Sequence, residues 1–277
     1  MRYLKLKVDL HLHNSRDMAE NRKNNKRMVD PKDYIDMAVE KGFDAIAFTH
    51  HGLLYHDPKI SRYAREKGII LIPGIEAYIK RKHVLLINYA RRKHIVDFDT
   101  LRKEKTDDMI VIAPHPFYKT RFCLEDELEK NIDCFDAVEY CHFYTRLINP
   151  NRKALRLARK HSLPMVGNSD AHHAYQFGTT YSYVYANDRS VTSIIEAIKA
   201  GRVEYVSQPL PLRKIVALAY TLILRVPTFS SVFLRKMIYK YRLEESLAVI
   251  KLSAIYRKFR FAFSKSRFIR NEDIATT

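Results

Sequence analysis

The sequence predicts an α/β fold, a TIM-like (β/α) barrel followed by a basic, helical C-terminal extension. Short apolar runs of strand length alternate with amphipathic helical patterns from Leu4 to Gly201. Nearly continuous apolar strands indicate a parallel sheet with helices on its faces. About seven such strands in a segment of this length fit a closed barrel better than a small doubly wound sheet. An open sheet is the alternative.

The elements in the first part of the chain follow in β/α order. The first strand covers 4–12, and the helix over 31–42 has Pro31 in its first turn, apolar residues at helical spacing and Gly42 as its stop. A helix over 58–68 repeats the Pro start and the Gly stop. The pattern predicts further strands at 44–49, 69–77, 83–89 and 109–115.

The second part continues the series. Helical patterns cover 124–131, 151–162 and 190–201, and strand patterns cover 136–140, 164–170 and 181–186. Beyond Gly201 the β pattern stops, and two prolines, at 209 and 211, mark a boundary. We therefore divide the chain into a barrel domain, 1–208, and an extension, 209–277.

Composition restricts the class of protein. The chain has 277 residues, 47% of them hydrophobic, which suffices for a sizeable core in one large or two small domains. The N-terminus lacks the apolar segment of a signal peptide, and the longest apolar run, 215–224, is too short to span a bilayer. Three cysteines, an odd number, indicate reduced thiols. We expect a cytoplasmic protein without a transmembrane segment.

Positive charge is concentrated in the extension. The net charge is +18, and residues 210–277 carry 14 Lys and Arg against 4 Asp and Glu. Aromatic residues are interleaved with these cations, an arrangement that can stack bases and follow phosphates or rest on an anionic membrane. A third reading is a helical segment packed on the barrel. Nucleic acid is therefore one candidate partner.

Polar side chains recur where the predicted strands end. Nearly every predicted strand ends at or beside a histidine or carboxylate, and the strand at 83–89 begins with one; the residues are His11, His13, His50, His51, Glu76, His83, His115, Glu139, Asp170 and His172. In a barrel the C-terminal strand ends converge on one face. Unpaired polar groups are costly to bury unless something binds them. Imidazole and carboxylate are ligands of zinc, manganese and iron, so the sequence predicts a metal site.

Two pairs of residues carry this prediction. Side chains at i and i+2 lie on one face of a strand, so His11 and His13 can bind one ion while their leucine neighbours pack the other way. Asp170 and His172 repeat the spacing at the end of another strand.

The motifs DLHLH, FTHHG, PGIEA, APHP and GNSDAHH, in this order, closely resemble the PHP (polymerase and histidinol phosphatase) family. The resemblance covers roughly residues 5–205. It implies a distorted seven-stranded barrel, (β/α)7, that holds up to three divalent ions at its C-terminal strand ends and hydrolyses phosphoesters.

The resemblance also implies individual roles. His51 stands where the family's TDHG motif has its ligand histidine, with His50 in place of the Asp, and Glu76 resembles the carboxylate that bridges two ions. The family usually has a further Asp or His after its H-x-H pair, and Asp17 is the residue that offers this, one position short of the usual offset. The implied metal ligands are His11, His13, Asp17, His51, Glu76, His83, His115, Asp170 and His172.

The implied reaction is cleavage of a phosphomonoester, nucleotide or short oligonucleotide by a metal-activated hydroxide, with two or three Mn, Zn or Fe ions as cofactors. We expect Glu76, His51 and Asp170 to be catalytic and Asp9 to orient an imidazole from behind. Arg16 and Arg121, on predicted loops, are candidates for binding the phosphate, the alternative being solvated surface charges.

A second hypothesis is a barrel that has lost catalysis and binds nucleic acid or a membrane surface through its basic tail. The near-complete ligand set favours the hydrolase, because a barrel without catalysis has no need of so many convergent ligands.

Overall fold

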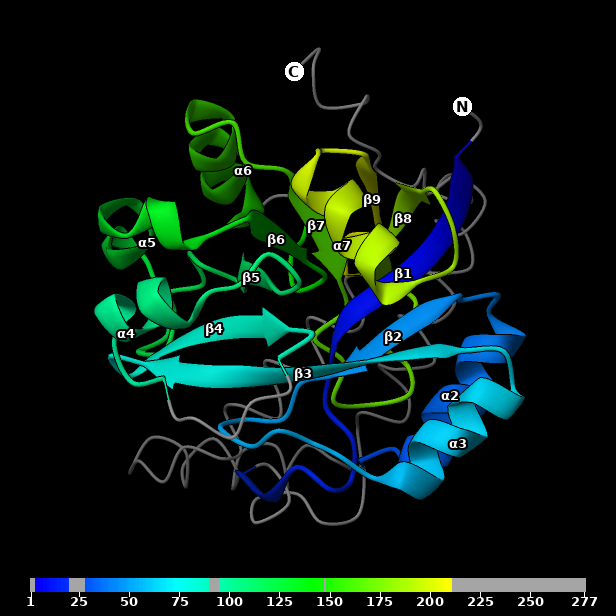
Figure 1. The fold of residues 1–277 in the computed structure, drawn as a ribbon. Coiled ribbons are helices and arrows are strands. Elements are labelled where there is room, and N and C mark those ends of the chain that lie inside the picture. The colour runs from blue at the N-terminus through cyan, green and yellow to red at the C-terminus, as the bar shows by residue number, and fades with distance from the viewer. Residues whose placement is uncertain (1–2, 20–27, 90–94, 147, 211–277) are drawn as a thin grey trace, which may run out of the picture. The chain divides into compact units, whose positions relative to one another are not determined.

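The protein is described by a computed structural model that covers residues 3–19, 28–89, 95–146 and 148–210. The expected helical extension, 209–277, lies outside the described residues except for its first two positions. Within the described part, one sheet curls into a nearly closed barrel with helices on its outside (Figure 1). The predicted α/β barrel class is confirmed.

Nine strands, in the order β7-β6-β5-β4-β3-β2-β1-β8-β9, form the sheet of the described residues. Their bounds are β1 Leu4–Leu12, β2 Ala45–Phe48, β3 Ile70–Ile79, β4 Lys82–Ile87, β5 Ile110–Ala113, β6 Ala137–Cys141, β7 Met165–Asn168, β8 Thr180–Ala186 and β9 Val203–Ser207. The pairs β1–β2, β2–β3, β5–β6 and β6–β7 are parallel, as the β/α series predicts. The pairs β1–β8, β3–β4, β4–β5 and β8–β9 are antiparallel, so the sheet is mixed rather than parallel.

The antiparallel β3–β4 pair has a local cause, and the β8–β9 pair corrects a prediction. β3 and β4 join through Lys80 and Arg81, whose φ angles of 47° and 66° fit a two-residue hairpin turn that matches the twist of the strands. β9 pairs with β8, so the expectation that β structure stops at Gly201 is wrong. This strand is short and carries the half-buried Glu204, and it therefore lacks the continuous apolar run of a buried strand.

The helices begin where their caps are. Asp30 and Asp57 accept hydrogen bonds from backbone amides in the first turns of α2 (Pro31–Glu40) and α3 (Pro58–Glu66), and a proline occupies the first position of each helix. The others are α4 Phe98–Glu104, α5 Asp126–Lys130, the 3₁₀ turn η1 Ile132–Cys134, α6 Asn151–Lys160 and α7 Val191–Lys199. The helix α4 was not expected from the sequence, since it is short and has neither a proline start nor a glycine stop.

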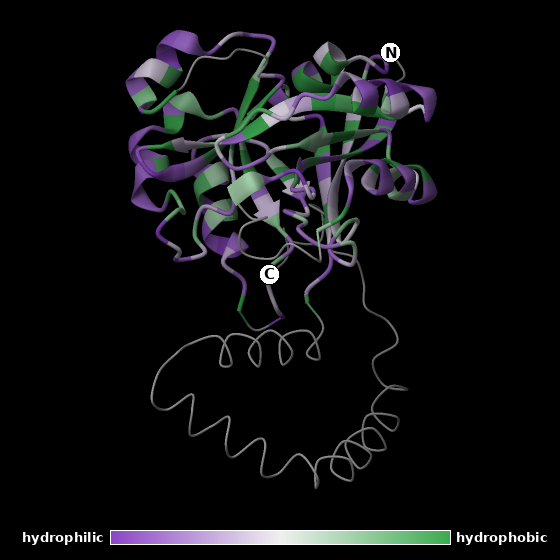
Figure 2. Ribbon diagram, turned by 90° about the horizontal axis from the view of Figure 1, so that it is seen from below, coloured by the Kyte–Doolittle hydropathy of each residue, from purple (hydrophilic) through white to green (hydrophobic). Residues whose placement is uncertain are grey.

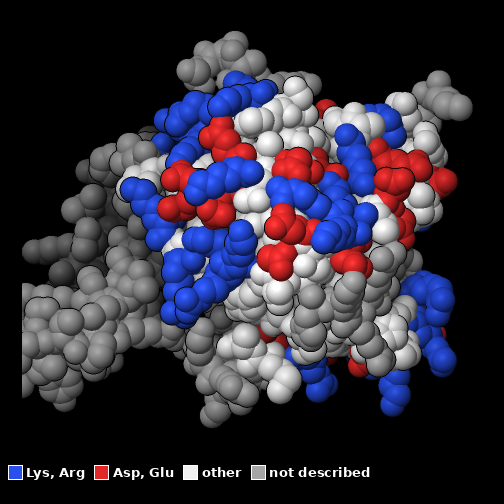
Figure 3. All heavy atoms as spheres, turned by 60° about the vertical axis from the view of Figure 1, so that its left-hand side comes forward, with Lys and Arg blue, Asp and Glu red and all other residues white. Residues whose placement is uncertain are grey.

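Hydrophobic residues lie on the strands and on the helix faces turned toward them, whereas the outer faces of the helices are hydrophilic (Figure 2). On the side of the barrel that carries α4, α5 and α6, basic and acidic side chains are interspersed (Figure 3). Arg102 lies 2.6 Å from Asp133 and Lys105 lies 2.7 Å from Asp136. Charge on this face is therefore balanced locally.

A seam between β7 and its neighbours positions the site. Asn168 accepts a hydrogen bond from the backbone of Leu10 (2.9 Å), and the His13 amide donates to Ala171 (3.0 Å). A Cβ atom on Gly167 would lie 2.6 Å from the carbonyl oxygen of Tyr181, so only glycine permits this approach. The seam brings the end of β1 beside the segment that follows β7.

Candidate metal centre

Histidines and carboxylates from six strands converge at one end of the barrel. His11 is the penultimate residue of β1, His13 follows the strand, and their Nε2 atoms lie 3.1 Å apart. His51 follows β2, His115 follows β5, and Asp170 follows β7. His83 lies near the start of β4, which is antiparallel to β3 and therefore begins at the edge where the parallel strands end.

Glu76, on β3, lies at the centre of the cluster. Its Oε1 atom is 2.6 Å from Nδ1 of His83 and 3.1 Å from Nε2 of His115. Its Oε2 atom is 3.0 Å from Nε2 of His51 and 3.5 Å from Nε2 of His13. One carboxylate therefore faces imidazoles on two sides.

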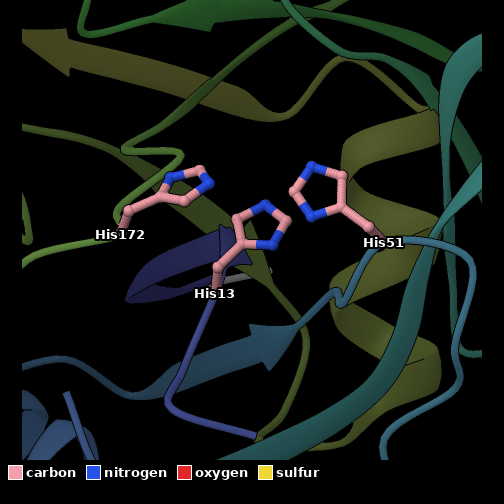
Figure 4. A group of neighbouring side chains, drawn as sticks. All are labelled: His13, His51 and His172. Carbon is pink, nitrogen blue, oxygen red and sulfur yellow. The ribbon is translucent and has the colours of Figure 1, made fainter. Parts of the chain in front are cut away.

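Asp170 closes the cluster from the opposite direction. Its Oδ1 atom lies 3.3 Å from Nε2 of both His11 and His13. The His13 ring stacks on His51 and on His172, each with 4.3 Å between ring centroids (Figure 4). Nitrogen and oxygen atoms from the described residues form four overlapping groups, each with its atoms within 4.8 Å of one another: His13, His51 and His172; His11, His13 and Glu76; His11, His115 and Asp170; and His51, Glu76 and His83.

Two residues of the cluster have left-handed backbone conformations. The φ angle is 28° at His115 and 46° at Asp170. Such angles are unfavourable for residues with a Cβ and persist where the surrounding structure enforces them, as at functional sites.

The outer nitrogens of the imidazoles have partners that fix the rings. Nδ1 of His11 lies 2.8 Å from Glu139, and Nδ1 of His172 lies 3.0 Å from the Asp170 carbonyl oxygen. Asp17 Oδ2 lies 2.8 Å from Nδ1 of His13 and 2.9 Å from Nδ1 of His51. Asp17, expected among the ligands, is thus placed behind two of them, and it is in none of the four groups.

Electrostatics in the cluster favour a protonated imidazole at His13 beside an ionised Glu76, whereas burial lowers the pKa values of His83 and His172. Burial acts to lower the pKa of His13, but hydrogen bonds to Asp17 and Asp170 outweigh it and raise this pKa to about 9. Burial acts to raise the pKa of Glu76, but the imidazoles around it, His83 first, hold this pKa well below its usual range. The proton on His13 therefore lies in a negative environment that would also favour a metal cation.

The residues fit divalent cations. Glu76 is 1% exposed, and its Oε2 atom, although 3.0 Å from Nε2 of His51, has no hydrogen bond of suitable geometry among the described residues. Both ring nitrogens of the buried His83 are likewise without one in the described part of the chain, although Nδ1 is close to Glu76. Buried polar atoms normally have partners, and mixed imidazole and carboxylate donors suit Zn²⁺, Mn²⁺ or Fe²⁺.

A pocket of about 510 Å³ opens beside the cluster. Arg121 lies at this pocket with its guanidinium carbon 4.5 Å from the centre of the Phe122 ring, which stacks on His83 at 4.8 Å. Tyr78 and Phe143 line the pocket and are 37% and 41% exposed, so they stand at its mouth. Arg16 is exposed, and it is not among the residues that line this pocket. Of the two arginines expected to bind phosphate, the structure brings Arg121 to the site.

Other residues around the site carry roles that sequence analysis did not assign. Asp9 was expected to orient an imidazole, but it bonds instead to the hydroxyl of Ser169 (2.5 Å) and the amides of Ser169 and His11. Gln176 accepts hydrogen bonds from the amides of His172 (2.9 Å) and of His173, which fixes the loop that carries His172. The spacing of Gln176 gives no signal, because the contacts that fix this loop are to the backbone amides of His172 and His173.

Comparison with known proteins agrees with the fold. The family model PHP_C, described as PHP-associated, matches residues 149–203. An uncharacterised protein of Methanocaldococcus jannaschii is 25% identical over 146 residues, which are 51% of this chain and 84% of that protein. Among the described residues, we find no helix that is both long enough and apolar enough to cross a membrane.

Two of the similar solved structures illustrate the fold. One is a two-domain protein from Bacteroides vulgatus described as containing a predicted PHP-like metal-dependent phosphoesterase, with a TM-score of 0.57 and 22% identity over 74% of this chain. The match covers 65% of that protein, so this chain corresponds to part of it. The other is PsfC from Pseudomonas syringae, with a TM-score of 0.54 and 18% identity over 78% of this chain and 96% of PsfC. Together with the family model, these similarities confirm the resemblance that the motifs indicate.

Proposed function

We propose that this chain, which has the fold of PHP-like proteins, is a metal-dependent phosphoester hydrolase. The observation that carries the proposal is the convergence of eight side chains from six strands on one cluster of donor atoms. Burying so many ionisable groups together is unfavourable unless cations bind among them.

Two or three divalent ions, Mn, Zn or Fe, suit the four groups of donor atoms. Glu76 belongs to two of the groups and carries two oxygens, so this carboxylate would be available to more than one ion, whereas each histidine would hold one. Ions bound here, as in other metal-dependent hydrolases, would hold phosphoryl oxygens and lower the pKa of a water molecule.

The chain's own residues prepare the site for that chemistry. The two oxygens of Glu76 face different histidines, and Asp170, in a left-handed backbone conformation, places Oδ1 3.3 Å from His11 and His13. We infer that Glu76, His51 and Asp170 are the catalytic residues, because they border both the donor groups and the pocket.

The pocket supports a small phosphorylated substrate. Its volume lies within the range of about 300–1,000 Å³ typical of small-molecule sites. Arg121 supplies a cation for a phosphate, and Tyr78 and Phe143 supply aromatic surface for an organic group. A phosphomonoester, a nucleotide or the end of a short oligonucleotide has both features, so we propose these as substrates.

Hydrolysis by metal-stripped and metal-reloaded protein tests the proposal. We expect no turnover of p-nitrophenyl phosphate, nucleoside monophosphates or a short RNA without metal, and turnover of at least one of them when Mn²⁺ is returned. Glu76→Gln should abolish that turnover. His161→Ala is the matched control, since His161 lies at the C-terminal end of α6 and pairs with Glu129.

The outcome separates the two hypotheses for the chain. Turnover that persists after metals are stripped contradicts the hydrolase proposal. Absence of turnover on the whole panel, in protein that has bound metal, favours the barrel as a binding module.

A further inference from the structure

One turn of the chain contacts two of the histidines that would hold ions. Residues 120–123 lie between β5 and α5, and the Cys123 amide donates to the Thr120 carbonyl oxygen (3.1 Å). The amide of His83 donates to the carbonyl oxygen of Phe122 (2.8 Å), whose ring stacks on that imidazole. Cys123 then places its sulfur 3.7 Å from Nδ1 of His115.

This sulfur takes a position that oxygen atoms take elsewhere in the cluster. The outer nitrogens of His11, His13, His51 and His172 each lie 2.8–3.0 Å from a carboxylate or carbonyl oxygen. His115 has Cys123 there instead. Histidines that bind metals usually donate their second N–H to such a partner, which fixes the tautomer and the ring orientation.

We propose that Cys123 is a positioning residue of the metal centre, an inference that rests on the proposed function. In this arrangement the Cys123 sulfur, 3.2 Å from Thr120 Oγ1, would accept a hydrogen bond from the N–H at Nδ1 of His115. This arrangement would leave the lone pair of Nε2, which lies 3.1 Å from Glu76, available to a divalent cation. Cys123 is 1% exposed, so water does not compete for the contact.

The Cys123 sulfur would also make the donor groups differ in their affinity for a cation. A thiol sulfur is a weaker acceptor than a carboxylate, and it makes the imidazole that it contacts a weaker donor to a cation. The group of His11, His115 and Asp170 should therefore bind its ion less tightly than the group that contains His13 and His51, both of which face Asp17.

Metal binding by Cys123 variants tests the inference. For Cys123→Ala we expect the affinity for the most weakly held Mn²⁺ to fall about 10- to 100-fold, as for other lost outer partners, in competition with a chelator. Cys123→Ser restores an acceptor and should recover most of the affinity. Cys134→Ala is the matched control, because Cys134 is buried and its sulfur contacts the Phe98 carbonyl oxygen instead.

Two results overturn the inference. One is unchanged affinity for every ion in folded Cys123→Ala, with folding checked by circular dichroism. The other needs no variant: ¹⁵N NMR of the zinc-loaded wild type should show His115 bound through Nε2 with a proton on Nδ1, and the opposite tautomer contradicts the proposal. If the wild type itself binds no metal, the proposed function fails. If the wild type binds metal and Cys123→Ala binds it equally well, only the inference about Cys123 fails.

Discussion

The carboxylate of Asp17 lies behind the imidazole of His13, with Oδ2 2.8 Å from Nδ1. The same oxygen accepts a hydrogen bond from the backbone amide of His51 at 3.1 Å. Asp17 is fully buried, so a single carboxylate holds two histidines from different strands in fixed orientations.

We therefore expect Asp17→Asn to weaken metal binding without removing an ion. The amide keeps the volume of the side chain but loses the charge that favours both imidazoles, so affinity should fall about 10- to 100-fold. Elemental analysis at saturating Mn²⁺ should still give the wild-type stoichiometry, as should the surface control Asp36→Asn. Loss of one full equivalent at saturation would instead make Asp17 a direct ligand.

Metal binding should depend on pH through His13. Its pKa is raised from 6.5 to about 9 in the metal-free protein, so protonated His13 stabilises that state fully below pH 6.5. This stabilisation is lost as the pH rises toward 9, whereas an ion needs the neutral imidazole. The difference in Tm between metal-loaded and metal-free protein should therefore widen from pH 6.5 to 9.

A His13→Gln variant supplies the check on that assignment. Removing the titrating imidazole should reduce the pH dependence, to which His11 and His115 also contribute because their pKa values are raised too, whereas His161→Ala should leave it unchanged. A pH dependence of equal slope in His13→Gln would show that another group is responsible.

Substitution of the two candidate arginines should have unequal effects. Arg121 lines the pocket, and Arg16 does not. Loss of a charge-assisted hydrogen bond costs about 1.5–3 kcal/mol, so Arg121→Gln should raise KM for a phosphoester about tenfold or more. Arg16→Gln is the matched control with the same change of charge. Equal effects of the two variants on KM would contradict a role of Arg121 in binding the phosphate.

Closure of the barrel should tolerate no side chain at position 167. A Cβ there would meet the carbonyl oxygen of Tyr181 at 2.6 Å and Cβ of Tyr205 at 2.8 Å. We expect Gly167→Ala to lower the free energy of unfolding by about 3 kcal/mol, since a backbone carbonyl cannot rotate away. Gly68→Ala is a control with a left-handed φ of 75° in open space, for which about 1–2 kcal/mol is expected. Chemical denaturation gives both free energies of unfolding. A smaller loss of stability for Gly167→Ala than for Gly68→Ala would mean that the backbone around Gly167 can move to accommodate a Cβ.

The sequence predicted those parts of the fold whose signals are local. Apolar runs and capped helices such as α2 and α3 were found because each signal lies within one segment. The direction of β4 depends on the two-residue turn at Lys80 and Arg81, and the existence of β9 depends on its pairing with β8, so strand periodicity reveals neither.

The same division applies to the site. Residue type and strand ends indicated eight of the residues that converge, from His11 to His172. Whether a carboxylate such as Asp17 faces the centre or lies behind an imidazole depends on rotations within one loop, which spacing does not determine. The sequence does not indicate a role for Cys123, because a single cysteine has no signature for contact with His115.

Anomalous diffraction from crystals of metal-loaded protein, collected at the absorption edge of the bound metal, tests the central claim most directly. The account predicts two or three peaks among His11, His13, His51, Glu76, His83, His115, Asp170 and His172, with Asp17 behind them. A cluster with no peak, or with one isolated peak that leaves Glu76 without an ion, would contradict it.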